Sequence, residues 1–134
     1  MKKTDVLVVG GGPAGSLAAM TGKASFPDKE FVIVSNENHS MVPCGIPYIF
    51  GTLNGVEKNM LPNDRLTKAG IGLLTGELKS IDRGARVCEM VDGSKLGYDR
   101  LVLALGSYPV VPKWLKGAEL KNVHVIKKEK EYLD

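Results

Sequence analysis

The sequence predicts an α/β fold in which a parallel sheet is flanked by a helix and continues into an antiparallel β-meander. Three observations lead to this prediction. An apolar run at residues 6–9 passes directly into a glycine-rich turn and an alanine-rich segment. A second apolar run at residues 31–34 completes a β-α-β unit. Further along, short alternating runs separated by turn residues precede a fully apolar run at residues 101–105.

The glycine-rich turn has the pattern Gly10-x-Gly12-x-x-Gly15. The first glycine permits a tight turn off the strand, the second lets a pyrophosphate approach the backbone, and the third lets the helix pack close to the sheet. The helix, expected at about residues 14–24, directs unpaired N–H groups and its positive dipole end at a bound anion. The turn therefore predicts a nucleotide pyrophosphate site.

The end of the second strand is the expected ribose-binding position. A carboxylate normally stands there, about 20 residues beyond the last glycine, and binds the adenosine ribose hydroxyls. This chain has Ser35 at that place. Because a serine makes a neutral hydrogen bond where a carboxylate makes charge-assisted ones, we expect weaker ribose binding, or binding through Asn36 or Glu37. The alternative for Glu37 is a solvated loop carboxylate.

Length and charge restrict the class of protein. The 134 residues suit one domain of ordinary globular composition. The formal net charge is only +3, and the lysine clusters at the two ends, residues 2–3 and 121–130, are small, with carboxylates interleaved in the second, so we expect no nucleic-acid partner and no membrane surface. No signal peptide is visible, and no apolar run approaches the ~20 residues that span a bilayer. We therefore expect a cytoplasmic protein.

The two cysteines, Cys44 and Cys88, lie far apart in the sequence, and a disulfide between them is not expected in a reducing compartment. Neither has metal-ligand spacing, and His39 and His124 lack a ligand pattern around them, so we expect no metal site. Cys88 occupies a strand-like alternation and is predicted to pack in the core.

Cys44 stands in a segment with the character of a helix start, Pro43-Cys44-Gly45-Ile46-Pro47. Pro43 disfavours helical geometry in the residue before it, and Pro47 fits a helix only in its first turn. Cys44 is therefore expected at or beside a helix N-terminus, where the dipole favours the thiolate and creates a nucleophile. The alternative is an inert, buried cysteine. The crowding of glycine and proline favours redox chemistry.

The rest of the chain supplies a short helix and the meander. Residues 62–66 predict a turn and helix N-cap, with a helix to about Ala69. The expected meander strands cover residues 71–75, 77–81, 86–90 and 95–98. The apolar run at residues 101–105 suits the centre of a parallel sheet, and Gly106 at its end is expected to approach a bound nucleotide.

Three ordered motifs carry a family resemblance: GGGPAG at residues 10–15, VPCGIPY at residues 42–48 and LVLALGSYP at residues 101–109. Together they resemble the flavin half of the pyridine nucleotide-disulfide oxidoreductases. The single-cysteine branch of coenzyme A-disulfide reductases, NADH oxidases and NADH peroxidases is the most similar, because Ile49 stands where dithiol members have a second cysteine. The resemblance implies a Rossmann-like FAD/NAD(P)-binding fold, present as an incomplete FAD domain.

The resemblance also implies a cofactor and a chemistry. FAD would lie with its pyrophosphate on the glycine turn, and Cys44 would cycle beside the flavin ring between a thiolate and a mixed disulfide or sulfenic acid. NAD(P)H would supply electrons to a disulfide, peroxide or oxygen. The expected cofactor-binding residues are Gly10, Gly12, Pro13, Ala14, Gly15, Ser35, Asn36, Pro43, Ala104 and Gly106. Two positions depart from the family pattern, Ser35 for a carboxylate and Leu105 for the threonine of Ala-Thr-Gly.

Only one Gly-x-Gly-x-x-Gly occurs in the chain. Residues 1–126 are therefore expected to be the N-terminal portion of an FAD domain, and residues 127–134 a charged linker toward an absent NAD(P)-binding domain. We expect such a part of a reductase to be inactive alone. The alternative is a stand-alone or degenerate nucleotide-binding module without redox activity, and an unpaired sheet edge could make it a homodimer.

Overall fold

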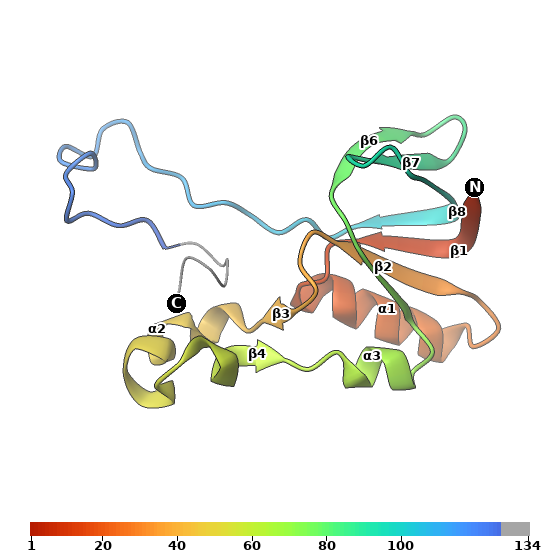
Figure 1. The fold of residues 1–134 in the computed structure, drawn as a ribbon, viewed down its shortest axis with the longest axis horizontal. Helices are drawn as coiled ribbons and strands as arrows, with labels where there is room; N and C mark the ends of the chain where they lie inside the picture. The colour runs from red at the N-terminus through yellow and green to blue at the C-terminus, as the bar shows by residue number, and fades with distance from the viewer. Residues whose placement is uncertain (127–134) are drawn as a thin grey trace. The chain divides into compact units, whose positions relative to one another are not determined.

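The computed structural model describes residues 1–126, so the expected linker at residues 127–134 lies outside the described residues. The chain divides into two compact units (Figure 1). The first unit comprises Met1–Val42 and Met60–Gly106. The second comprises Pro43–Asn59 and Ser107–Asp134, the latter described as far as residue 126. Each unit is described separately below.

A six-stranded mixed sheet forms the first unit and confirms the expected α/β fold class. Its strands are β1 (Lys2–Val9), β2 (Phe31–Ser35), β5 (Gly72–Thr75), β6 (Leu78–Asp82), β7 (Val87–Met90) and β8 (Lys95–Leu103). They follow the order β5-β2-β1-β8-β7-β6. The first four of these are parallel neighbours, and β8, β7 and β6 are antiparallel neighbours. One sheet therefore contains both the parallel part and the meander.

Two of the expected strand assignments were wrong. Residues 95–98 and 101–105 belong largely to one strand, β8, which pairs with β1 along most of its length. The polar residues between them stay in the strand because its backbone continues to pair with β1, and Asp99 also forms an ion pair with Lys3 on β1, at 2.7 Å. Residues 72–75 do not join the meander, since β5 pairs in parallel with β2. Hydrophobic periodicity predicts that a segment is a strand, but it does not predict which strand it pairs with.

The helices α1 (Pro13–Ser25) and α3 (Asp64–Lys68) cover one face of the parallel strands (Figure 1). Their buried residues form a core with alternate residues of β1 and β2: Val8, Ala19, Phe31, Ile33, Leu66 and Ile71. The other face of the sheet carries a second core of Leu7, Val9, Val32, Val34, Cys88, Met90 and Tyr98. Because successive strand residues point to opposite faces, each apolar strand supplies both cores. The complete burial of Cys88 confirms its predicted packing role.

Short elements connect these layers. The strands β3 (Ser40–Met41) and β4 (Met60–Leu61) form a small antiparallel pair in the first unit. In the sequence between β3 and β4, the second unit contains the 3-10 turn η1 (Pro43–Gly45), α2 (Ile46–Tyr48), the π-helical turn η2 (Ile49–Leu53) and the 3-10 turn η3 (Val56–Asn59). The described residues 107–126 form turns without a helix or strand.

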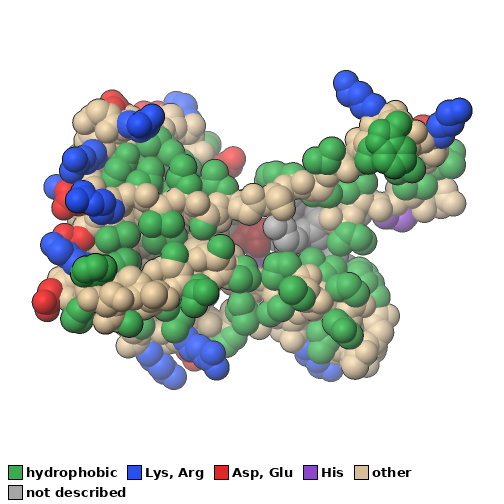
Figure 2. Space-filling model, turned by 180° about the vertical axis from the view of Figure 1, so that it is seen from behind, with side chains coloured by type: hydrophobic (Ala, Val, Ile, Leu, Met, Phe, Trp, Pro, Cys, Tyr) green, Lys and Arg blue, Asp and Glu red, His purple; other side chains and the backbone are tan. Residues whose placement is uncertain are grey.

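One side of β8 is unpaired over its second half. The partner residues from β7 end opposite Gly97, whereas β1 accompanies β8 as far as Leu103. Within residues 1–126, no strand pairs with the remaining side of β8 from Asp99 onward. Leu103 and Leu105 are both more than half exposed there. In Figure 2, hydrophobic side chains extend across the displayed face, with Lys and Arg side chains mainly at its margins.

Candidate functional site

The turn between β1 and α1 brings three strand ends together. Gly10 has a φ of +110°, which a residue with a side chain rarely adopts. Its N–H donates to the carbonyl of Val34 at 2.8 Å, and the N–H of Ala104 donates to the carbonyl of Val9 at 2.8 Å. A Cβ atom at Gly10 would overlap the carbonyl oxygen of Ala104. Glycine is therefore required at this position by the fold itself.

Gly15 has an equally crowded position at the start of α1. A Cβ atom there would overlap the carbonyl oxygen of Gly10 and lie 3.3 Å from the methyl group of Ala104. The helix therefore begins directly on the turn, as the sequence pattern predicts. The side chain of Ser16 closes the turn by donating to the carbonyl of Gly11 at 3.0 Å.

Gly12 differs from both, because among the described residues no atom beyond its chain neighbours lies within 4 Å of the place where its Cβ would stand. It is the N-cap of α1, which makes no side-chain capping hydrogen bond and has no acidic residue in its first turn. The helix extends for 13 residues, from Pro13 to Ser25, rather than the expected 14–24. Its first turn presents backbone N–H groups without intrahelical acceptors, beside open space. This arrangement admits an anion close to the backbone.

A cavity of about 170 Å³ lies next to this turn, at the carboxyl ends of β1, β2 and β5. Gly11 of the glycine turn lines it, its polar side chains are those of Ser35, Glu37, Asn38, His39, Asn63 and Thr75, and Leu73 and Leu74 are among its apolar residues. Gly11 and Ser35 are adjacent, since a Cβ on Gly11 would lie 3.2 Å from the Ser35 hydroxyl oxygen. Asn36 is exposed and does not line the cavity.

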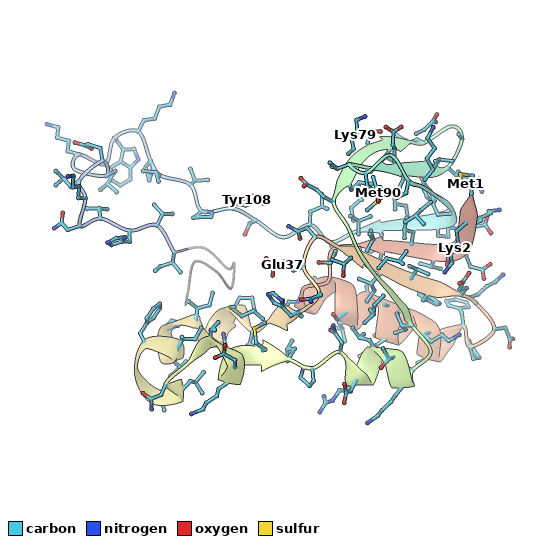
Figure 3. The ribbon with its side chains drawn as sticks, viewed as in Figure 1. Met1, Lys2, Glu37, Lys79, Met90 and Tyr108 are labelled. Carbon is cyan, nitrogen blue, oxygen red and sulfur yellow. The ribbon has the colours of Figure 1, made fainter. Side chains whose placement is uncertain are left out.

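The polar residues of this cavity form a connected network. Glu37 Oε2 lies 2.9 Å from His39 Nε2, and the other ring nitrogen, Nδ1, lies 2.9 Å from Asn38 Oδ1. Asn63 donates from Nδ2 to the carbonyl of Asn38 at 2.8 Å. The N–H of Glu37 donates to the Ser35 hydroxyl at 3.3 Å. Figure 3 labels Glu37 just beyond the end of β2. The loop is thereby held in a defined conformation.

Sequence reasoning missed His39 and Asn63 as members of this site. The signal available for His39 was its place two residues after Glu37, but a histidine in a polar loop has many roles. Asn63 precedes α3, and the β3–β4 pair places it beside the loop after β2. No local sequence pattern predicts that Asn63 lies beside Asn38.

The carboxyl end of β8 supplies the other expected cofactor-facing residues. Ala104 is half-buried against Gly10 and Gly15, as described above. Gly106 is exposed and has a φ of +73°, so a side chain there would be strained. The structure thus brings Ala104 to the glycine turn, whereas the sequence separates the two by most of the chain.

Pro43 and Cys44 belong to the second unit, in the 3-10 turn η1, and both are exposed. Pro47 lies in the first turn of α2, as expected. α2 continues directly into η2, so an unbroken helical segment of mixed 3-10, α and π geometry extends from Pro43 to Leu53, and Cys44 lies in its first turn, as expected. A Cβ atom on Gly45 would overlap the side chain of Asn59, which is only 5% exposed. Packing against Asn59 therefore shapes the turn that contains Cys44.

Both cysteines are free thiols. Burial raises the pKa of the Cys88 thiol above its ordinary value of 9.0. Within residues 1–126, no three His, Cys, Asp or Glu side chains are grouped closely enough to hold a metal ion. The helices of this same part are too short or too polar to cross a membrane.

The sequence profile described as "Pyridine nucleotide-disulphide oxidoreductase" matches residues 4–132. The chain belongs to this family. It matches the N-terminal flavin-binding region of pyridine nucleotide-disulphide oxidoreductases, whose members depend on FAD and use NAD(P)H as reductant. The resemblance drawn from the three sequence motifs is thereby confirmed.

Individual members of the pyridine nucleotide-disulphide oxidoreductases support this membership. The chain is 38% identical over 128 residues, 92% of its length, to an "NAD(P)H sulfur oxidoreductase (CoA-dependent)" of Pyrococcus abyssi. It is 30% identical over 131 residues, 90% of its length, to an "NADH oxidase" of Methanocaldococcus jannaschii. The chain spans only 28% and 29% of these two proteins, respectively.

A solved structure agrees with this fold. The NAD-dependent persulfide reductase from A. fulgidus superposes with a TM-score of 0.72 at 28% identity. The match covers 86% of this chain and 24% of that one. The likeness is therefore to a part of a larger reductase.

Proposed function

We propose that the first unit binds the ADP half of FAD, and that the chain serves as the N-terminal flavin part of an NAD(P)H-dependent reductase. The open space at Gly12 carries this proposal. Gly10 and Gly15 are glycines because the surrounding backbone leaves no room for a side chain. Gly12 has free space around it, so the fold does not require a glycine there. We attribute this glycine to the pyrophosphate, which a side chain would keep away from the backbone.

The residues present suit the dinucleotide. The first turn of α1 offers N–H groups to a pyrophosphate, and Pro13 and Ala14 at its start are exposed. Gly11 and Ser35 connect that turn to the adjoining cavity. The proposed cofactor-binding residues are Gly10, Gly12, Pro13, Ala14, Gly15, Ser35, Asn36, Pro43, Ala104 and Gly106. When bound, FAD supplies the two-electron chemistry that links NAD(P)H to a sulfur or oxygen acceptor.

Cys44 is the proposed redox residue, because its thiol is exposed and free, whereas that of Cys88 is buried. Its thiolate would attack one sulfur of a disulfide or polysulfide, form a mixed disulfide and release the other sulfur as a thiolate. With a peroxide, the same thiolate would attack one oxygen, break the O–O bond, become a sulfenic acid and release the other oxygen as hydroxide or an alkoxide. A single cysteine suffices because the substrate supplies the second sulfur or the oxygen.

The names of the relatives support sulfur compounds or oxygen as the acceptor, since they include a sulfur oxidoreductase, a persulfide reductase and an NADH oxidase. Peroxide stays a further proposed substrate. We also propose a cytoplasmic location, because a reducing compartment maintains free thiols such as Cys44 and Cys88.

The decisive experiment is a visible absorption spectrum of the purified chain before and after incubation with excess FAD and gel filtration. We expect flavin bands near ~370 and ~450 nm that co-migrate with the protein. Riboflavin, which lacks the ADP half, serves as the matched ligand and should be lost on the column. A colourless protein after FAD treatment would contradict the proposal. Retention of ADP without FAD would favour the alternative of a nucleotide-binding module without redox activity.

A further inference from the structure

We infer that Glu37 is the carboxylate that binds the adenosine ribose hydroxyls in this chain, and that His39 positions it. This inference rests on the proposed function and deepens it, because it assigns a task that Ser35 is poorly suited to perform. Ser35 offers one hydroxyl, and that hydroxyl already accepts a hydrogen bond from the N–H of Glu37 at 3.3 Å. A ribose hydroxyl binds more strongly to a charged acceptor than to a neutral one.

The location of Glu37 suits this task. Glu37 lines the same cavity as Gly11 of the glycine turn and Ser35 at the end of β2. In β-α-β nucleotide sites, the ribose next to the pyrophosphate is bound at the end of the second strand. Glu37 lies two residues beyond Ser35, the position where the carboxylate is expected. The loop after β2 nevertheless places its side chain in the same cavity.

His39 holds this carboxylate in place. Its Nδ1 atom forms a hydrogen bond with Asn38 Oδ1 at 2.9 Å, which anchors the ring, and its Nε2 atom lies 2.9 Å from Glu37 Oε2 without the alignment of a hydrogen bond. The side chains of Glu37 and His39 are 28% and 20% exposed, respectively. Among the described residues, no hydrogen bond or ion pair to the second carboxylate oxygen, Oε1, is found, so Oε1 is the proposed acceptor for a ribose hydroxyl. The pair thus orients a charged acceptor in a cavity partly shielded from water.

The geometry also favours one class of nucleotide. A negative carboxylate beside the 2′ position accepts a hydrogen bond from a free hydroxyl but repels a 2′-phosphate. The ligand is therefore an adenine dinucleotide with unmodified ribose hydroxyls, such as FAD, and not a 2′-phosphorylated one.

The test compares the affinities of ADP and 2′-deoxy-ADP for wild-type chain and for Glu37→Gln by titration calorimetry. Wild type should prefer ADP by about tenfold or more, the size expected for a hydrogen bond to a charged group. Glu37→Gln should reduce this preference to about twofold. Glu30→Gln is the matched control, because it makes the same change in an exposed residue just before β2, at the other end of that strand, and should keep the wild-type preference.

A second pair of variants tests the role of His39. His39→Leu should lower the ADP preference, and His39→Gln, which keeps a donor toward Glu37, should restore most of it. A change in overall stability alone would weaken both nucleotides equally and leave their ratio unchanged.

The outcomes separate the two claims. Wild-type chain that binds neither FAD nor ADP would overturn the proposed function. If wild-type chain binds ADP and 2′-deoxy-ADP equally well, the inference about Glu37 is overturned while the proposed function stands. This result requires no variant. An unchanged preference in folded Glu37→Gln would overturn the inference equally.

Discussion

Gly10 lies directly against the backbone of Ala104, so that a side chain on the first would overlap the carbonyl oxygen of the second. This contact joins the end of β1 to the end of β8, which pair in parallel. Gly15 packs on the same place from the helix side. Two of the three motif glycines therefore serve the fold, and Gly12 alone faces open space.

The first prediction follows from this division. Gly10→Ala should lower the free energy of unfolding by about 2–4 kcal/mol, because it adds backbone strain to an overlap with Ala104. Gly12→Val should lower the free energy of unfolding by only about 1 kcal/mol, the cost of replacing an N-cap glycine by a β-branched residue, and should abolish FAD retention. Urea denaturation and the flavin spectrum measure the two effects. Gly84→Val, in the exposed turn after β6, is the matched control and should retain FAD. FAD retention by Gly12→Val would remove the pyrophosphate from this turn.

The second prediction concerns the two thiols. Iodoacetamide should modify Cys44 in the native chain, whereas Cys88 should react at least about a hundredfold more slowly because reaction needs local unfolding. The exposed position of Cys44 and the full burial of Cys88 are the reasons. Mass spectrometry of proteolytic peptides distinguishes the sites, and urea should make both reactive. Equal native rates would contradict the described packing of Cys88.

The third prediction concerns Cys44 in a longer enzyme that contains this region. Cys44→Ser should keep the bound flavin and abolish disulfide or polysulfide turnover, because the mixed disulfide needs a sulfur nucleophile. Cys88→Ser makes the same exchange in the core. It should preserve the dependence of turnover on Cys44 while lowering stability. Unchanged turnover in Cys44→Ser would exclude that residue from the reaction.

The fourth prediction concerns acid stability at Asp5. A hydrogen bond from the N–H of Glu30, at 2.8 Å, and the neighbouring Lys29 lower the pKa of Asp5 below its ordinary value of 3.8. The unfolded chain therefore takes up this proton more readily than the folded one. The resulting stabilisation is present above about pH 3.8 and is lost as the pH falls through the folded-state pKa.

Urea midpoints of wild type and Asp5→Asn, measured at about pH 6 and about pH 3, test this sign. The variant should be less stable than wild type at the higher pH, and the difference should shrink at the lower. Asp28→Asn, in the exposed loop after α1, provides the matched charge change. A difference that grows on acidification would show that the pKa shift has the opposite direction.

The fifth prediction concerns the unpaired side of β8. Backbone groups from Asp99 to Leu103 lack a strand partner on that side among the described residues, and such an edge invites pairing with a second copy. Sedimentation velocity should detect a concentration-dependent homodimer. Leu103→Lys should weaken it, because a charge on the edge opposes pairing. Leu17→Lys, on the exposed side of α1, should not. A monomer at all concentrations would contradict this proposal.

The sequence by itself determined the β-α-β unit, the roles of Gly10 and Gly15, and the packing of Cys88. These features depend on interactions between residues close in sequence. Apolar periodicity indicates which residues are buried, and a glycine in a strand-to-helix turn indicates a backbone position without room for a side chain. The family resemblance followed from three such local motifs and their order.

The tertiary structure alone decided which strands pair and which polar groups meet. β5 and β8 have ordinary strand patterns, yet one pairs with β2 and the other runs unbroken beside β1 through Asp99. Asn63 reaches the loop of Glu37 and His39 only because the chain returns through the β3–β4 pair. Strand pairing and polar networks join residues distant in sequence, so their free energy depends on partners that no local pattern encodes.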